Sequence, residues 1–202
     1  VGGEPDAWVD DALKSAQNKN MKVINLLDVL GNSVKEEEQV EGMQAEEEEE
    51  EGEEEGPEYD EHVWLSLKNA KTLCSSIADA LCEIDSKNAD VYKKNLNEYT
   101  KNLDALDKEY QQVVNGAKYD TLVFGDRFPF RYMVDDYSLK YYAAFVGCSA
   151  ETEASFETIK FLANKVDELG VTTVLTIEDP KHKIAQTVVE NTKEKNQKIL
   201  AL

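Results

Sequence analysis

The sequence predicts an α/β fold of two lobes, with parallel sheets flanked by helices, joined by one long rigid helix. From residue 117 onward, short apolar runs alternate with amphipathic segments, which is typical of a parallel sheet covered by helices. Between Tyr92 and Val113, apolar residues recur at alternating spacings of four and three, which predicts one uninterrupted helix. Residues 1–87 are therefore interpreted as the remainder of an N-terminal lobe, 88–116 as the connecting helix and 117–202 as the C-terminal lobe.

The N-terminal lobe is predicted to contain a helix, a strand and an acidic loop. Asp6 is suited to cap a helix whose apolar stripe begins with Ala7 and Trp8. The apolar run Lys22–Leu27 has the length of a strand. From about residue 33 to 61 there is no periodicity, only Glu with Gly, Gln and Pro, so we expect a mobile loop inserted in the lobe.

Two helices are predicted after this loop. Ser66 is a good N-cap for the first, whose apolar positions share one face that we expect to be buried: Leu67, Ala70, Leu73, Cys74, Ile77, Leu81 and Ile84. The second is the long helix, which we expect to end at Asn115-Gly116. A coiled coil is the alternative, but tyrosines at three of its seam positions favour a stripe that lies across the rest of the protein.

The C-terminal lobe is predicted to alternate strands and helices. The expected strands are 121–124, 141–145, 172–177 and 198–202, and the expected helices are 130–137, a helix capped by Ser155 that stops at Gly170, and 182–192. Ligands of parallel sheets bind beyond the carboxyl ends of the strands. That rule selects Asp126, after the first strand, and Glu178, after the third.

The charge of the chain is concentrated in one segment. The formal net charge is -20, and sixteen of the 42 acidic residues lie between Glu36 and Glu61, where there is no Lys or Arg. The remainder is close to neutral and shows no cluster of basic residues that would neutralise phosphates. We therefore expect no nucleic-acid partner.

Several other function classes lack support in the sequence. The three cysteines form no disulfide framework and no CxxC pair, and they are interpreted as small buried apolar groups. No apolar run approaches the ~20 residues of a membrane span. No phosphate-binding glycine loop, nucleophile elbow or HExxH motif is present, so no enzymatic activity is predicted.

The sequence leaves more than one interpretation open for each candidate site residue. His62 follows the acidic run and adjoins Trp64, so it is either a ligand or a half-buried histidine at a helix start. Asp126 either faces a cleft, caps the next helix or pairs with a nearby arginine. Glu178 either faces a cleft or caps the helix that follows it.

The sequence resembles the metal-binding substrate-binding proteins of bacterial zinc and manganese ABC importers, the cluster A-I type. The resemblance extends over nearly the whole chain and is carried, in order, by YDEHVWLSLKNA, a long helix, DTLVFGDRFPFRYMVDDYSLKYYAAF, SAETEASFETI and VLTIEDPKHKIAQT. It implies two α/β lobes joined by one helix, with a divalent metal between the lobes.

The resemblance also implies two metal ligands in this chain. His62 matches the family's second ligand and Asp126 stands where the third, a His or Glu, is found. The first and fourth ligands are expected outside the chain, before Val1 and at or after Leu202, because both ends look cut inside the fold. Glu178 resembles a family glutamate at the cleft that is not a ligand.

The implied function is extracytoplasmic capture of Zn²⁺, with Mn²⁺ second, and delivery to a membrane ABC permease. A monomeric lipoprotein on the surface of a Gram-positive bacterium is expected. The acidic loop is either a loose collector of cations or a solvated spacer. The alternative function is a surface adhesin or interaction protein on the same fold, with incidental metal binding.

Overall fold

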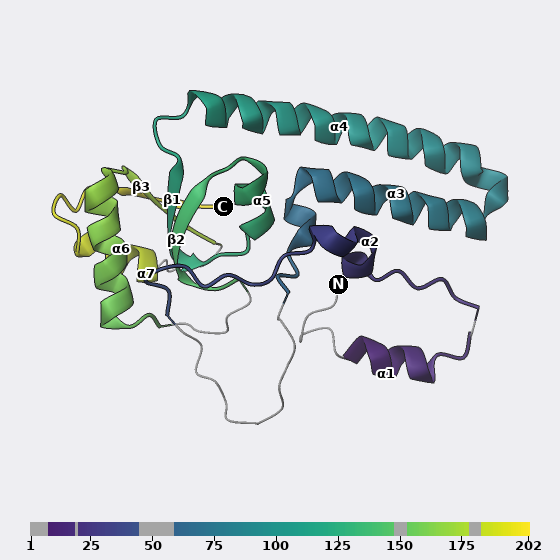
Figure 1. Cartoon of the computed structure of the whole chain (residues 1–202), viewed down its shortest axis with the longest axis horizontal. Helices are drawn as coiled ribbons and strands as arrows, with labels where there is room; N and C mark the ends of the chain where they lie inside the picture. The colour runs from purple at the N-terminus through teal and green to yellow at the C-terminus, as the bar shows by residue number, and fades with distance from the viewer. Residues whose placement is uncertain (1–7, 19, 45–58, 148–152, 178–182) are drawn as a thin grey trace. The chain divides into compact units, whose positions relative to one another are not determined.

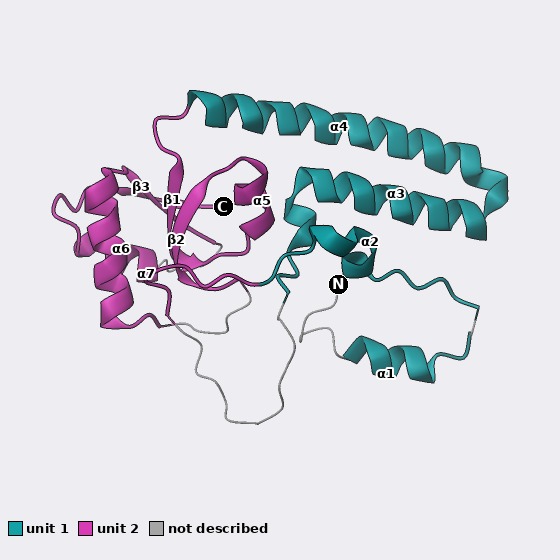
Figure 2. Ribbon diagram, viewed as in Figure 1, with its two compact units in different colours: residues 1–36, 57–116 teal, residues 37–56, 117–202 magenta. Residues whose placement is uncertain are grey.

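The structure, a computed structural model, divides the chain into two compact units (Figure 2). Unit 1 comprises Val1–Glu36 and Pro57–Gly116, and unit 2 comprises Glu37–Gly56 and Ala117–Leu202. The residues that the structure describes are 8–18, 20–44, 59–147, 153–177 and 183–202. Within these ranges, no helix is both long and apolar enough to cross a membrane.

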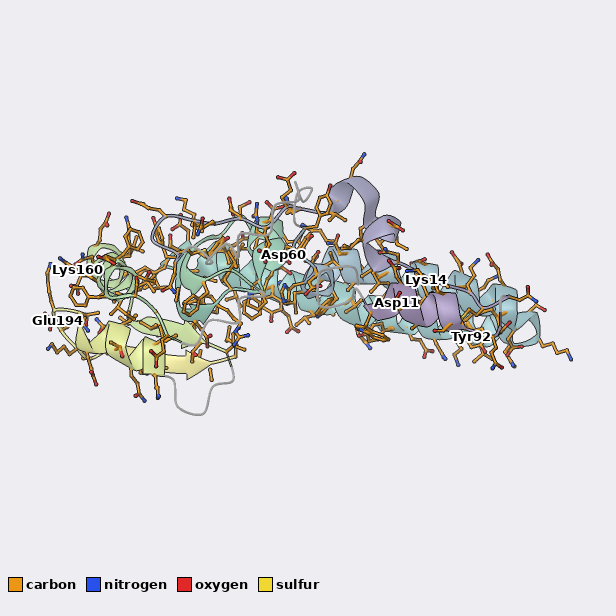
Figure 3. The ribbon with its side chains drawn as sticks, turned by 90° about the horizontal axis from the view of Figure 1, so that it is seen from below. Asp11, Lys14, Asp60, Tyr92, Lys160 and Glu194 are labelled. Atoms are coloured by element: carbon orange, nitrogen blue, oxygen red, sulfur yellow. The ribbon has the colours of Figure 1, made fainter. Side chains whose placement is uncertain are left out.

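Unit 1 is built from helices in its described part (Figure 1). They are α1 (Trp8–Ser15), α2 (Leu26–Leu30), α3 (Leu67–Ile84) and α4 (Ala89–Gly116), with 3-10 turns η2 (Gly31–Ser33), η3 (Val63–Leu65) and η4 (Ser86–Asn88). On α1, Asp11 and Lys14 form an exposed ion pair at 3.0 Å (Figure 3), and Trp8 is 66% exposed. The helix has no buried residue, so its predicted apolar stripe joins no core.

The strand predicted at Lys22–Leu27 is wrong, because the second half of this run begins α2. The side chain of Asn25 accepts hydrogen bonds from the backbone N–H groups of Leu27 and Asp28, which caps the helix and ends the extended segment. The only β pairing in the described part of unit 1 is an isolated bridge between Glu36 and Tyr59. The predicted α/β class, with a parallel sheet and a long helix, is confirmed, but the observed sheet lies in unit 2.

Helices α3 and α4 lie side by side as a hairpin (Figure 1). Ser66 caps α3 as predicted, since its hydroxyl accepts a hydrogen bond from the backbone N–H of Asn69 at 3.0 Å. The predicted long helix is confirmed as the 28-residue α4, which spans about 42 Å at 1.5 Å per residue. Lys71 and Asp104 connect the two helices through an ion pair of 2.6 Å.

The apolar faces of the hairpin are only partly buried. On α4 Leu103 is buried, but other members of the stripe are 38 to 70% exposed: Tyr99, Leu106, Tyr110 and Val113. On α3 Leu73 is buried, whereas the later positions are 39 to 67% exposed: Ile77, Leu81 and Ile84. The prediction of a fully buried face on α3 is wrong for these residues, whereas a stripe of α4 that lies across the rest of the protein stays a prediction. Helical spacing places side chains on one face, but burial also requires a neighbour that covers it.

Unit 2 contains a parallel sheet of four strands, β1 (Thr121–Arg127), β2 (Lys140–Phe145), β3 (Thr173–Thr176) and β4 (Lys198–Ala201). The strand order is β2-β1-β3-β4, and every pair is parallel. All four strands predicted for the C-terminal part of the chain are confirmed. Their carboxyl ends point to the same edge of the sheet, which is where Asp126 lies near the end of β1.

Three helices accompany this sheet: α5 (Arg131–Asp136), α6 (Phe156–Leu169) and α7 (Lys183–Glu190). Ser155 caps α6 and Gly170, at φ 63°, ends it in the left-handed conformation, as predicted. The core of unit 2 is closed by side chains from β1, β3, α6 and α7: Val123, Val174, Leu162, Val166 and Val188. A Cβ at Gly125 would lie 2.5 Å from the Cα of Ala185, so α7 packs directly on the β1 backbone.

The first part of the acidic segment packs on unit 2. The backbone N–H of Gln44 donates to the carbonyl of Ala144 at 3.0 Å, and the hydroxyl of Tyr141 donates to Glu38 at 3.2 Å. Gly42 has φ 84° and faces the ring of Phe161 so closely that a Cβ would overlap it. The predicted mobile loop is therefore wrong for residues 37–44, whereas its Glu-rich centre, 45–58, lies outside the described residues.

Candidate metal centre

His62 lies just after the point where the acidic segment returns to unit 1. Glu36 and Tyr59 form an antiparallel bridge, and the backbone N–H of Asp60 donates to the carbonyl of Lys35 at 3.0 Å. These contacts join the two ends of the segment. The backbone that leads into His62 is therefore held by hydrogen bonds from a part of the chain that lies 25 residues earlier.

Asp60, which is labelled in Figure 3, makes two contacts with His62. Its Oδ1 accepts a hydrogen bond from the backbone N–H of His62 at 2.8 Å, and the same oxygen lies 3.1 Å from Nδ1 of the imidazole. The side chain of Asp60 is only 4% exposed, and that of His62 is 16% exposed. The carboxylate is thus buried against the ring, while part of the imidazole reaches the surface.

The residues that follow His62 in the chain also hold its backbone in place. His62 occupies the position before η3, and the first residue of that turn, Val63, is completely buried. The ring of Trp64 lies 5.7 Å from the imidazole, centroid to centroid, at an interplanar angle of 48°. Because η3 leads straight into Ser66 and α3, the backbone of His62 is coupled to a long helix. His62 is indeed a half-buried histidine at a helix start, which is compatible with a ligand role.

Asp126 connects two neighbouring strands. Its Oδ2 accepts hydrogen bonds from the hydroxyl of Thr176 at 2.6 Å and from the backbone N–H of Ile177 at 2.9 Å. Its Oδ1 accepts from the backbone N–H of Arg127 at 2.8 Å. The side chain is 15% exposed and lies 4.0 Å from the guanidinium Nε of Arg127. These contacts tie the end of β1 to the end of β3.

The hydrogen bonds of Asp126 limit what else it can bind. A carboxylate offers about four lone-pair sites, and three donors occupy Asp126 among the described residues. A metal ion would therefore have to approach the remaining site on Oδ1. The helix-capping alternative is not observed, since no side chain caps α5. Arg131 contacts Glu38, at 3.2 Å, rather than Asp126.

The structure describes the two predicted ligands in different units, His62 in unit 1 and Asp126 in unit 2. Within the described ranges, no group of three or more His, Cys, Asp or Glu side chains is arranged to hold a metal ion. Glu178 lies outside these ranges. The assignment of His62 and Asp126 to one site therefore stays a prediction.

Sequence reasoning missed Asp60, which it counted only as one member of an acidic run. Sixteen carboxylates between Glu36 and Glu61 look alike in sequence, and most of them carry no positional signal. The signal that distinguishes Asp60 is its spacing, two residues before the histidine. A carboxylate at that spacing can accept from the backbone N–H of the histidine and also reach its ring.

Comparison with known proteins gives a match over the whole chain. The family model described as ZnuA, zinc-uptake complex component A, periplasmic, matches residues 1–202. The high-affinity zinc uptake system protein ZnuA of Brucella abortus (strain 2308) is 31% identical over 137 residues. That alignment covers 67% of this chain and 40% of the relative, so the matched part spans well under half the length of the relative.

Two solved structures share the fold. A Zn(II)-bound mutant variant of AdcAII from Streptococcus pneumoniae has a TM-score of 0.70 at 25% identity, covering 98% of this chain and 67% of the other. The laminin-binding protein Lbp of Streptococcus pyogenes has a TM-score of 0.60 at 27% identity, covering 71% of this chain and 54% of the other.

Proposed function

Because the chain belongs to the ZnuA family of periplasmic zinc-uptake components, we propose that it captures Zn²⁺ outside the cytoplasm for an ABC importer. Its role is that of a solute-binding protein rather than an enzyme. The metal is cargo, which is bound, carried to a membrane permease and released there. Anchoring as a lipoprotein at a Gram-positive cell surface, and a monomeric state, remain part of this proposal.

The observation that carries the proposal is that the backbone of His62 is held in place while its ring stays partly exposed. Its backbone is held by Asp60 on one side and by η3 and α3 on the other, while its ring remains 16% exposed. An imidazole held in this way needs little reordering when a metal binds. Imidazole nitrogen is a common zinc ligand, so the residue type fits the cargo named by the family.

The choice of Zn²⁺ before Mn²⁺ follows from ligand chemistry. Nitrogen ligands suit zinc, whereas manganese prefers carboxylate, carbonyl and water oxygens. A site with His62 and the remaining lone-pair position of Asp126 would present both types. The affinity order of divalent metals also favours Zn²⁺ over Mn²⁺ at a given nitrogen and oxygen site. Mn²⁺ is therefore proposed as the second cargo.

Zinc titration of single-histidine variants tests the proposal. The chain has two histidines, so His182→Ala serves as a matched control for His62→Ala. Competition with a chelating dye should show zinc affinity at least about tenfold weaker in His62→Ala and unchanged in His182→Ala. The protein should be expressed with whatever residues its gene places before Val1 and after Leu202. Equal zinc affinities of wild type and His62→Ala would reject His62 as a ligand.

A surface adhesin is the second candidate function, supported by the similarity to the laminin-binding protein Lbp. In that case, metal binding is incidental and the protein surface binds an extracellular partner. Binding of the chain to immobilised laminin should be measured with and without a metal chelator. Binding that is saturable and unaffected by the chelator would favour the adhesin, and absence of binding would leave cargo capture as the proposal.

A further inference from the structure

We propose that residues 37–44 form a strap, a second tether that restrains the motion of one unit relative to the other while it is attached to unit 2. The chain passes between the units three times, after Glu36, after Gly56 and after Gly116 (Figure 2). The last passage follows the long helix α4, and the strap makes the first. The effect of the strap on zinc rests on the proposed function, whereas its role as a tether does not.

An ionic latch attaches the start of the strap to α5 and β2. Oε2 of Glu38 accepts a hydrogen bond from the hydroxyl of Tyr141 at 3.2 Å and lies 3.2 Å from the guanidinium Nε of Arg131. The side chain of Arg131 is 21% exposed and that of Glu38 is 45% exposed. The latch thus joins a largely buried guanidinium to a carboxylate that is partly in solvent, and salt should weaken it by screening.

The middle of the strap packs on the core of unit 2. Val40 and Met43 pack against the apolar cluster that contains Phe128. Between them the chain turns, and the backbone N–H of Met43 donates to the carbonyl of Val40 at 3.1 Å. Gly42, at φ 84°, places this turn against the ring of Phe161 on α6. The strap therefore extends from α5 to α6 within unit 2.

A neutral clasp attaches the end of the strap to β2 and α6. The backbone N–H of Gln44 donates to the carbonyl of Ala144 at 3.0 Å, and its side-chain Oε1 accepts from the backbone N–H of Ser155 at 2.7 Å. Ser155 is the N-cap of α6, and in a capping box the side chain three residues later accepts from the N-cap N–H. Here that residue, Thr158, accepts from the hydroxyl of Ser155 instead. Gln44 therefore supplies the acceptor from 111 residues earlier in the chain.

The tether is short because its anchors are close together in the chain. Glu36 belongs to unit 1, where it forms an antiparallel bridge with Tyr59, and the carbonyl of Lys35 accepts from the backbone N–H of Asp60. Glu38 is held in unit 2 by the latch. Two residues of chain span at most about 7 Å. A motion that draws these anchors further apart therefore requires the bridge or the latch to break, whereas a link made by α4 alone would leave a hinge at its end free to open.

Variants of the two attachment points test whether the strap can be released. Glu38→Ala/Gln44→Ala removes the latch and the side-chain part of the clasp. Gln39→Ala is the matched control, because Gln39 lies on the same strap, is exposed and has no side-chain hydrogen bond to the described residues. Gln44→Glu keeps an oxygen that can accept from Ser155, so it should behave as the wild type. Hydrogen exchange of the residue 44 amide should be at least about tenfold faster in the double variant alone.

Motion between the units is measured as the distribution of distances between two spin labels, by pulsed electron double resonance. The labels replace Lys87 of unit 1 and Lys160 of unit 2, both exposed, as genetically encoded amino acids that leave the native cysteines in place. The distribution should be broader in the double variant than in the wild type, Gln39→Ala and Gln44→Glu. Zinc release to a chelating dye, measured on the same protein as the zinc titration, should be at least about fivefold faster in the double variant.

Three outcomes would overturn the proposal. Equal exchange of the residue 44 amide in the wild type and the double variant would exclude the attachment. Faster exchange with an unchanged distance distribution would exclude the tether. A broader distribution with unchanged zinc release would exclude control of the cargo. Circular dichroism checks the fold, and the single variants Glu38→Gln and Gln44→Ala replace a double variant that does not fold. If His62→Ala has no effect on zinc, the proposed function fails instead, while exchange and distances still decide the tether.

Discussion

Replacing Asp126 by alanine is expected to lower the free energy of unfolding of unit 2 by about 2–4 kcal/mol. The carboxylate accepts from Thr176, Ile177 and Arg127, and it is 15% exposed. A hydrogen bond to a charged group contributes about 1.5–3 kcal/mol, and an orphaned buried donor costs about 1–3 kcal/mol. The hydroxyl of Thr176 has a second acceptor, the carbonyl of Ile177 at 3.1 Å, so the main orphan is the Ile177 N–H.

Urea unfolding followed by circular dichroism measures the global effect, and hydrogen exchange of the Ile177 amide measures the local one. Asp120→Ala is the control, because this carboxylate is 66% exposed and pairs with Lys140 at the surface. Exposed ion pairs typically contribute about 0–1 kcal/mol, so the control should change little. A change below about 0.5 kcal/mol in Asp126→Ala, with unaltered protection of Ile177, would refute the structural role.

Two further predictions concern the acidic segment and the turn between α3 and α4. Gly42→Ala should release residues 37–44 from unit 2 and speed hydrogen exchange there, since its Cβ would overlap the ring of Phe161. Gly31→Ala, also at positive φ but with open space around its Cβ, should leave this exchange unchanged, and equal effects would refute the contact. The pKa of Asp85 is lowered, chiefly by a hydrogen bond from Asn88. Its ionised form therefore stabilises the fold above the unfolded pKa of about 3.9, and this contribution is lost as pH falls through the lower folded pKa. Asp85→Asn should flatten the dependence of melting temperature on pH in that range, and an unchanged slope would contradict the assignment.

The local elements were the most predictable part of the fold. Ser66 and Ser155 cap helices as predicted, because a cap depends on hydrogen bonds to a backbone three residues away. The strands of unit 2 and the long helix α4 follow from periodicity within a single segment. The run Lys22–Leu27 misled the prediction because an apolar run of that length fits a strand or the start of a helix equally well, and Asn25 decides for the helix.

The candidate site was predictable in its residue types but not in its contacts. His62 stood out as one of two histidines at the end of an acidic run. The contacts of Asp60 depended on burial, which distinguishes it from the other carboxylates of the same run that the structure describes. Whether Asp126 has lone pairs available depended on Thr176 and Ile177, which lie about fifty residues further along the chain.

By itself, the sequence determined the α/β class, the positions of most helices and strands and the membership of a metal-uptake family, because these depend on short-range patterns and on motifs in fixed order. The tertiary structure alone decided which apolar stripe is covered, which carboxylate is buried against His62 and how many of the lone pairs of Asp126 are occupied. The physical reason is that burial and hydrogen-bond occupancy are properties of neighbours in space. Those neighbours are brought together from distant parts of the chain only when it folds.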